Sequence, residues 1–230
     1  MSLVNKVFIR HRARSFVCDG RDRVTNCAKE SFALVIHTHS AEHFIPSSNA
    51  LVVASALEVL VGSTDGSVKL WSLDHEEPLA DMEGHGPNRV SRLAFHPSGR
   101  FLGTTCFDHS WRLWDLEVCE EVLHQEGHSK AVYDIAFHPD GSLALTAGLD
   151  SFGRVWDLRT GRCVMFLEGH LEEMLGVDIA ANGYHAATCS ADNCVRIWDL
   201  RQQQTIYLLS GSDILCAYVG LSLIHLIAHA

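Results

Sequence analysis

The chain has 230 residues, 47% of them hydrophobic, so it is long enough to bury a sizeable core. Its formal charge of −10 hides an asymmetry, because residues 1–30 carry seven Lys and Arg against three Asp and Glu and leave the rest of the chain at −14. An acidic surface argues against sequence-independent binding of nucleic acid, which needs clustered cations. The composition therefore favours protein partners.

Residues 1–40 are expected to be a disordered basic leader. Their arginines stand among apolar residues, as in an organellar transit peptide. Two acidic residues, Asp19 and Asp22, and the lack of a clear amphipathic period oppose that alternative. We expect a repeat domain over residues 41–212 and an apolar tail over residues 213–230 to follow the leader.

The repeat is marked by an aspartate and a tryptophan that recur in phase. The two series are Asp65, Asp108, Asp150 and Asp192, and Trp71, Trp114, Trp156 and Trp198. Both advance in steps of 43, 42 and 42 residues, and a Gly-His dipeptide stands at 84–85, 127–128 and 169–170. A period of 40–45 residues with Gly-His near its start and Trp-Asp at its end is typical of a four-stranded β-propeller blade.

Residues 127–169 show how one unit divides into strands. The stretches AVYDIAFHP, SLALTAG, GRVWDL and CVMFLEG are short and β-rich, and Pro-Asp-Gly, Asp-Ser and Arg-Thr-Gly turns separate them. No helix is needed to account for the pattern. Because one four-stranded sheet cannot bury both of its faces, neighbouring units must stack. The sequence therefore predicts an all-β fold of stacked blades.

The number of units limits this fold. The blades are expected to end near residues 73, 116, 158 and 200, whereas a propeller of seven such blades needs about 300 residues. We therefore predict an incomplete β-propeller, an open fan of about four blades. Its two end faces, Leu60 to Trp71 and Val195 to Leu209, are expected to meet water, which makes the chain prone to associate through its ends.

The first unit departs from the pattern. Val61 occupies the position of a threonine that the other units share. Glu42-His43 stands where Gly-His is expected, but Phe44-Ile45-Pro46 matches the end of a first strand, as Phe-His-Pro does in the next two units. The two alignments exclude each other, and the sequence leaves both open.

The tail and the cysteines give no signal for a site. The apolar run from Ile214 is shorter than the ~20 residues of a membrane span and contains histidines, so the first strand of a further blade is favoured over an anchor. The eight cysteines lack paired spacing, which indicates reduced thiols of an intracellular protein. Cys189 and Cys194, and the histidines at 37, 39 and 43, come nearest to metal-ligand spacing. Both cysteines lie in expected strands, and no metal site or cofactor is predicted.

Three units carry the same four residue types in phase. The sets are His85, Thr104, Asp108 and Trp114; His128, Thr146, Asp150 and Trp156; and His170, Thr188, Asp192 and Trp198. They match a hydrolase triad in type, but a triad needs one nucleophile beside an oxyanion hole, whereas three copies argue for structure. We predict a buried relay that joins indole, hydroxyl, imidazole and carboxylate in that order. The chain is not expected to be an enzyme.

A cation recurs two residues before each tryptophan, at Lys69, Arg112, Arg154 and Arg196. Residues two apart on a strand share a face, so a contact between the cation and an aromatic ring within the blade is expected. The alternative is a basic stripe that binds RNA, which the lack of interleaved exposed aromatic residues opposes.

A candidate protein-binding rim combines residues before the turn aspartates with residues where first strands begin. The six residues are Phe107, Leu149, Ala191, Arg89, Val132 and Met174. An apolar rim is typical of a protein docking site. The alternative is that these side chains pack against neighbouring blades.

The spacing from Gly-His to Trp-Asp between Gly84 and Leu200 resembles the WD-repeat family. More narrowly, RFLGTTCFDHSWRLWDLE and FGRVWDLRTGRC are similar to the WD-repeat subunits of the spliceosomal tri-snRNP, over about residues 57–204. The resemblance implies a scaffold in the nucleus that supports pre-mRNA splicing through protein–protein interactions. It also implies splicing-factor proteins of the tri-snRNP and a cyclophilin-type isomerase as partners, with small nuclear RNA contacted only indirectly. No membrane and no small-molecule substrate are expected.

A second function comes from the ends of two units, Trp156-Asp157-Leu158-Arg159 and Trp198-Asp199-Leu200-Arg201. These WDxR ends are similar to the motif by which WD-repeat substrate receptors dock on the adaptor of a cullin ubiquitin ligase. The alternative hypothesis is therefore a substrate receptor of such a ligase.

Overall fold

A computed structural model describes residues 7–8, 17–18, 50–54, 58–72 and 78–210. All regular elements in these ranges are β-strands, and no helix there has the length and apolarity that crossing a membrane requires. The strands are short because an Asp, Gly or Pro turn interrupts the chain every six or so residues. The all-β prediction is confirmed.

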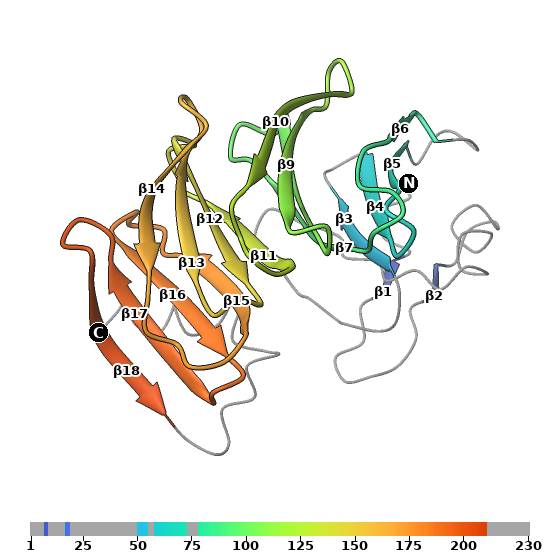
Figure 1. The fold of residues 1–230 in the computed structure, drawn as a ribbon. Coiled ribbons are helices and arrows are strands. Elements are labelled where there is room, and N and C mark those ends of the chain that lie inside the picture. Colours follow the sequence, from blue (N-terminus) through green and yellow to red (C-terminus); the bar gives the residue numbers. More distant parts are fainter. Residues whose placement is uncertain (1–6, 9–16, 19–49, 55–57, 73–77, 211–230) are drawn as a thin grey trace.

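Four antiparallel four-stranded sheets follow one another along the chain and spread as a fan (Figure 1). The first contains β3 (Ala50–Ala54), β4 (Glu58–Ser63), β5 (Val68–Ser72) and β6 (Ala80–Met82). The second contains β7 (Val90–Phe95), β8 (Phe101–Cys106), β9 (Ser110–Asp115) and β10 (Glu120–Glu126). The third contains β11 (Val132–Phe137), β12 (Leu143–Gly148), β13 (Gly153–Asp157) and β14 (Arg162–Leu167). The fourth contains β15 (Met174–Ile179), β16 (His185–Ser190), β17 (Cys194–Asp199) and β18 (Gln204–Ser210).

Each sheet is a simple meander whose strands pair in chain order. Two further short strands, β1 (Val7–Phe8) and β2 (Val17–Cys18), pair with each other. The described sheets do not close into a ring, so the prediction of an open array of four-stranded blades is confirmed.

The blades end one strand later than the repeats suggest. The sheets end at Met82, Glu126, Leu167 and Ser210, not near residues 73, 116, 158 and 200. The reason is that Trp-Asp closes the third strand, and the next strand still pairs with it, as β14 does with β13. The boundary expected from the marker residues is therefore displaced from the boundary of the folded sheet.

The first strand of the first sheet is β3, in which Ala54 pairs with Val59 of β4. In the second sheet the corresponding pair is Phe95 with Leu102. Both segments considered for the start of this unit, Glu42-His43 and Phe44-Ile45-Pro46, lie outside the described residues. Most of the basic leader and the apolar tail also lie outside them.

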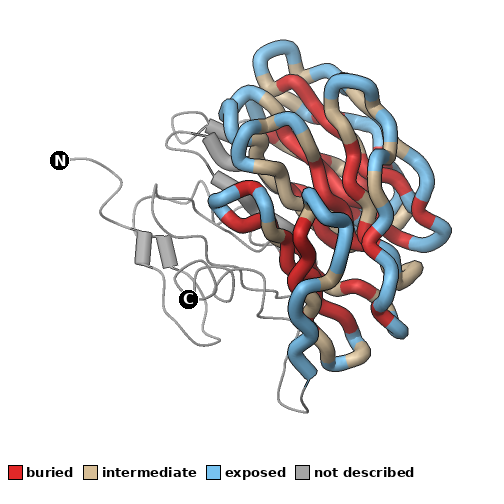
Figure 2. The backbone as a smooth tube through the Cα atoms, turned by 90° about the vertical axis from the view of Figure 1, so that its left-hand side faces the viewer, coloured by how far each residue is buried: buried red, intermediate tan, exposed pale blue. Residues whose placement is uncertain are grey.

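The core lies between neighbouring sheets, with a separate cluster of buried residues at each of the three boundaries (Figure 2). Leu60 and Val68 of the first sheet pack with Leu93 of the second, and Trp111 of the second packs with Ile135 of the third. The third and fourth sheets share a cluster that contains Leu145, Met174 and Trp198. Each blade therefore buries its apolar face against a neighbour, as a repeat architecture requires.

Polar contacts also join the sheets. The Asp134 carboxylate accepts hydrogen bonds from Arg92 Nε of the second sheet at 2.6 Å and from the Val177 backbone N–H of the fourth at 3.0 Å. His96 Nε2 lies 2.9 Å from the carbonyl oxygen of Gly141, and His138 Nε2 lies 2.8 Å from that of Gly183. The histidine of each Phe-His-Pro segment therefore bonds the first turn of the next sheet.

The expected exposure of the last sheet, over Val195 to Leu209, is found in only part of this range. Val195 and Ile197 on β17 are buried and pack with Ala187 and Cys189 in a cluster of their own. The exposed apolar side chains lie on β18, where Ile206, Tyr207, Leu208 and Leu209 are 38–60% exposed. The apolar surface of the fourth sheet is therefore provided by its outer strand.

Candidate functional site

The predicted relay residues of the third sheet lie in hydrogen-bonding contact. Trp156 Nε1 on β13 donates to Thr146 Oγ1 on β12 at 2.8 Å, and Thr146 Oγ1 lies 2.9 Å from His128 Nε2. His128 Nδ1 lies 3.0 Å from both carboxylate oxygens of Asp150, in the β12–β13 turn. The four side chains form one unbroken chain of hydrogen bonds.

The same arrangement recurs in the second and fourth sheets. In the second sheet the indole–hydroxyl, hydroxyl–imidazole and imidazole–carboxylate distances are 2.9, 2.7 and 3.0 Å. In the fourth sheet they are 2.8, 2.8 and 3.0 Å. All twelve predicted residues are thus brought together in three sets of four: His85, Thr104, Asp108 and Trp114; His128, Thr146, Asp150 and Trp156; and His170, Thr188, Asp192 and Trp198.

The positions of the four residues join two blades. His85 lies in the loop between β6 of the first sheet and β7 of the second, whereas Thr104, Asp108 and Trp114 belong to the second sheet alone. Trp114 also packs in the cluster shared with the first sheet. The relay therefore attaches the loop that arrives from one blade to the strands of the next.

The chemistry of each group fixes the direction of the hydrogen bonds. The carboxylate can only accept, so the facing imidazole nitrogen carries the proton, and the other ring nitrogen then accepts from the threonine hydroxyl. The hydroxyl oxygen in turn accepts from the indole N–H, which can only donate. Each indole, hydroxyl, imidazole and carboxylate group of a relay therefore has at least one hydrogen-bond partner.

The turn carboxylates are held in their ionised form. Burial alone would raise the pKa of Asp150, but hydrogen bonds from His128 and from backbone N–H groups outweigh it and lower the pKa below its ordinary value. The pKa values of Asp108 and Asp192 are lowered by the same balance. Burial lowers the pKa of His170, which favours its neutral form.

The glycine of Gly-His leaves room for the relay. A Cβ atom at Gly84 would lie 2.5 Å from Arg112 Nη1 and 3.0 Å from Trp114 Cη2. At Gly127, where φ is +155°, it would lie 3.2 Å from Trp156 Cη2. In the Gly-His dipeptide, the glycine therefore leaves room for the tryptophan and arginine side chains, and the histidine forms a hydrogen bond with the threonine.

The threonine is placed for bonding within the protein. Thr104, Thr146 and Thr188 are buried, and each hydroxyl oxygen is engaged by an indole on one side and an imidazole on the other. A nucleophile must instead face a cleft beside oxyanion donors. In this conformation a substrate has no access to the threonine hydroxyls.

The cations two residues before the tryptophans make different contacts in each sheet. Arg154 lies over the ring of Phe166 at 4.6 Å, which is the expected contact with an aromatic ring. Arg112 instead donates to Glu121 at 2.6 Å, and Arg196 to the carbonyl oxygen of Gly169 at 2.8 Å. Lys69 pairs with Asp81 at 3.3 Å.

The predicted rim is brought together only in part. The backbone N–H of Phe107 bonds the carbonyl oxygen of Arg89 at 2.9 Å, and the Arg89 guanidinium lies 5.4 Å from the Phe107 ring. Leu149 and Ala191 make the same backbone bond, at 2.9 Å, to residues 131 and 173. These four predicted residues therefore occupy equivalent or adjoining places on one rim.

Val132 and Met174 do not belong to the rim, because both side chains are 0% exposed and lie in the inter-sheet core. The true equivalents of Arg89 are Ala131 and Glu173, one residue earlier. A slip of one residue on a strand moves a side chain to the opposite face.

The sequence pattern missed one prominent rim residue. Leu171 directly follows a Gly-His dipeptide and is 84% exposed, whereas Gly86 and Ser129 occupy its place in the preceding units. Its backbone N–H bonds the Asp192 carboxylate at 3.0 Å, so it lies beside the turn. The signal for it is a large apolar residue where the other units have a small one.

The family model described as "WD domain, G-beta repeat" matches residues 76–115, 119–157 and 161–199. Together these stretches contain 118 of the 230 residues. Each matched stretch ends at the Trp-Asp dipeptide of β9, β13 or β17.

Several curated proteins are similar to parts of the chain. The protein named "U4/U6 small nuclear ribonucleoprotein PRP4" of Saccharomyces cerevisiae is 38% identical over 86 residues, which are 36% of this chain and 17% of that protein. "Nuclear distribution protein PAC1" of Yarrowia lipolytica is 35% identical over 77 residues, 32% of this chain and 17% of that protein. "Target of rapamycin complex subunit wat1" of Schizosaccharomyces pombe is 26% identical over 102 residues, 44% of this chain and 32% of that protein. The matches thus span less than a third of each of these relatives.

Proposed function

This chain belongs to the WD-repeat family, and from that premise we propose that it is a non-catalytic scaffold that supports pre-mRNA splicing in the nucleus through protein–protein interactions. The observation that carries the non-catalytic part is the threefold repetition of one buried hydrogen-bonded chain. Each copy lies in the same place in its blade and attaches a loop from the preceding sheet. Catalysis needs a single site, whereas a structural link between a loop and the next sheet is expected to recur from blade to blade.

The splicing role rests on similarity of sequence. Residues 100–117 and 152–163 resemble the WD-repeat subunits of the spliceosomal tri-snRNP, and PRP4 of Saccharomyces cerevisiae is among the similar proteins. We infer splicing-factor proteins of the tri-snRNP as direct partners and a cyclophilin-type isomerase as an associated one. The acidic repeat region supports only indirect contact with small nuclear RNA, because phosphate binding needs clustered cations.

The docking surface that we propose is the rim beside the turn aspartates. It consists of Phe107, Leu149, Ala191 and Arg89, together with Leu171. Leu171 is almost fully exposed, and the Arg89–Phe107 pair offers a cation stacked on a partly exposed ring. Apolar and Arg side chains grouped in this way are typical of the centre of a protein interface.

Affinity purification of the tagged chain from nuclear extract tests this function. The expected result is recovery of tri-snRNP proteins together with small nuclear RNA, and loss of the RNA after the proteins are removed with high salt. Recovery of neither proteins nor RNA, from a chain shown to be folded by circular dichroism, would contradict the proposal.

A second candidate function is that of a substrate receptor for a cullin ubiquitin ligase. Its support is that the arginines of both WDxR ends are exposed, with Arg159 84% and Arg201 60% accessible. Arg201 is also held over the Tyr184 ring at 4.2 Å. Recovery of a cullin and its adaptor in the same purification, lost in an Arg159→Ala and Arg201→Ala variant, would favour this function over splicing.

A further inference from the structure

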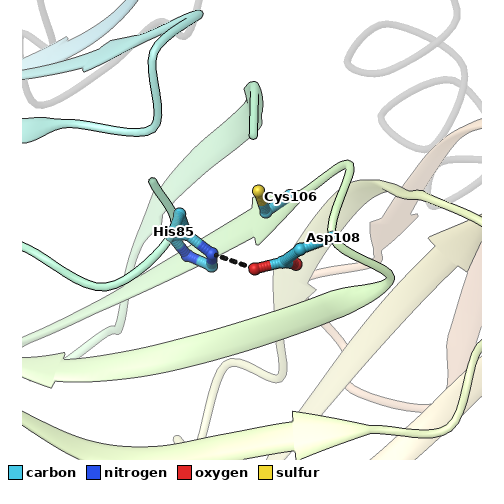
Figure 3. A group of neighbouring side chains, drawn as sticks. All are labelled: His85, Cys106 and Asp108. Carbon is cyan, nitrogen blue, oxygen red and sulfur yellow. Dashed lines mark hydrogen bonds and ion pairs between the residues drawn. The ribbon is translucent and has the colours of Figure 1, made fainter. Parts of the chain in front are cut away.

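The relay of the second sheet differs from the other two by one thiol. Cys106, the last residue of β8, lies beside the facing side chains of His85 and Asp108 (Figure 3). His85 Nδ1, Cys106 Sγ and a carboxylate oxygen of Asp108 all lie within 4.8 Å of one another. His85 and Cys106 are buried, and Asp108 is partly exposed at the turn.

The other blades show what is special about this position. The residues equivalent to Cys106 are Gly148 in the third sheet and Ser190 in the fourth. At Gly148 a Cβ atom would lie 2.3 Å from His128 Nδ1, so the third sheet has no room for a side chain there. The second sheet has room for a side chain there and fills it with a cysteine, whose thiolate is a soft metal ligand.

We infer that His85, Cys106 and Asp108 form a binding site for a single zinc ion, with His85 Nδ1, the Cys106 thiolate and the Asp108 carboxylate as ligands. One nitrogen, one sulfur and one oxygen donor form a set that Zn²⁺ accepts. The thiolate selects against Mg²⁺ and Ca²⁺, which take oxygen ligands. Three protein ligands leave the fourth zinc position open toward the partly exposed side of Asp108.

Zinc binding requires that His85 Nδ1 and Cys106 Sγ each give up a proton. The Nδ1 proton that His85 gives to Asp108 moves to the opposite ring nitrogen, so the imidazole stays neutral and its Nε2–H donates to Thr104 Oγ1. Thr104 changes from donor to acceptor toward His85 and still accepts from Trp114. The Cys106 thiol, which now bonds the Asn88 carbonyl oxygen at 3.5 Å, loses its proton to solvent as the Zn–S bond forms. Binding one Zn²⁺ therefore releases one proton.

In the protein, the bound zinc ion would link two neighbouring blades. His85 belongs to the loop that joins the first sheet to the second, and the other two ligands belong to the second sheet. Zinc would replace the imidazole–carboxylate hydrogen bond by two coordinate bonds and add the thiolate. The inference is independent of the splicing role, because it concerns a single blade boundary.

Titration of the full chain with Co²⁺, followed by displacement with Zn²⁺, tests the site. Co²⁺ bound to a thiolate gives a charge-transfer absorption that other ligands do not give. We expect one Co²⁺ per chain with that absorption and full displacement by Zn²⁺. Absence of the absorption in the folded chain would overturn the inference.

Two variants, based on the equivalent position in the fourth sheet, show whether the metal binds at Cys106. Cys106→Ser copies the fourth sheet, where Ser190 already stands in the folded blade, and should abolish the absorption without unfolding the chain. Ser190→Cys should add a second Co²⁺ site, with His170 and Asp192 as the other ligands. Unchanged absorption in Cys106→Ser would assign the metal to another cysteine, and a stoichiometry that stays at one in Ser190→Cys would contradict the sufficiency of these three donors.

Discussion

The threonine is the residue on which each relay depends. Its hydroxyl accepts from the indole and donates to the imidazole, which a single small group can do only when both neighbours lie within 3 Å. Val61 stands in the corresponding place of the first sheet, and a valine can do neither. The relay is therefore a property of the second, third and fourth sheets among the described residues.

Substitution of a relay aspartate should lower the free energy of unfolding more than substitution of the equivalent aspartate in the first sheet, which has no relay among the described residues. Asp150→Ala leaves the His128 Nδ1–H without its acceptor and should cost about 1–3 kcal/mol of unfolding free energy. Asp65→Ala is the matched control, since Asp65 is exposed and its carboxylate accepts hydrogen bonds from the neighbouring Ser67. Urea unfolding of both variants measures the difference, and equal losses would show that the relay adds nothing.

Acid should weaken the relays in two steps. Burial lowers the pKa of His170 below its ordinary value of 6.5, so the unfolded chain takes up that proton first and stability falls as the pH drops below about 6.5. The pKa values of Asp150 and Asp192 are also lowered in the fold, so their contribution is complete above about pH 4 and is lost as the pH falls further. Melting temperatures should stay level from pH 8 to about pH 6.5 and decline from there to pH 3, and a flat profile between pH 6.5 and 4 would be inconsistent with a buried neutral His170.

At the scale of the element, contacts between sheets explain why the blades stack in this order. The Asp134 carboxylate is buried and accepts from Arg92 of one neighbouring sheet and from the Val177 N–H of the other. One side chain therefore links three consecutive blades.

Asp134→Ala should be strongly destabilising. It leaves the Arg92 guanidinium and two backbone N–H groups without the carboxylate, and breaking a buried ion pair in this way costs about 3–5 kcal/mol. Asp81→Ala removes the partner of Lys69 from an exposed pair, with both side chains 40% accessible, and should cost about 1 kcal/mol or less. Chemical denaturation measures the free energy of unfolding of the two variants, and similar midpoints would refute the role assigned to Asp134.

The strands could be predicted from the sequence because their markers are local. Asp, Trp and Gly-His recur at one period, and each has a fixed place in a strand or turn. The relay was predictable for the same reason, since its four members recur in phase. The side of the strand on which each residue lies could not be predicted. Val132 and Met174 stand one residue after the true rim positions, and only the pairing of β11 with β12 and of β15 with β16 fixes the register.

Other features depend on exposure, which a repeat pattern does not encode. Leu171 is 84% exposed, and apolar residues of the outer strand β18 are exposed, whereas the inner strands of the same sheet bury theirs. Cys106 carries no spacing signal either, because its candidate co-ligands His85 and Asp108 come together only when the loop is fastened to the blade.

For the whole molecule, the apolar edge β18 predicts self-association. Its residues Ile206 and Leu208 are exposed on a strand that, within the described ranges, pairs only with β17, and such an edge strand is a template for pairing with another chain. Ile206→Lys with Leu208→Lys should shift the chain from oligomer to monomer in sedimentation velocity at micromolar concentration. Lysines placed instead at Val122 and Val164, which are exposed on β10 and β14, provide the control. A monomeric starting protein would contradict this prediction.

The central claim is that the protein acts by presenting the rim of a rigid blade array to splicing proteins. The most direct test is quantitative recovery of proteins and small nuclear RNA from nuclear extract by the wild-type chain and by Phe107→Ser with Leu149→Ser. Val122→Ser with Val164→Ser, on exposed outer strands away from the rim, is the matched control. The account predicts that the rim variant keeps its melting temperature and loses tri-snRNP components while the control retains them; undiminished recovery by a folded rim variant would contradict it.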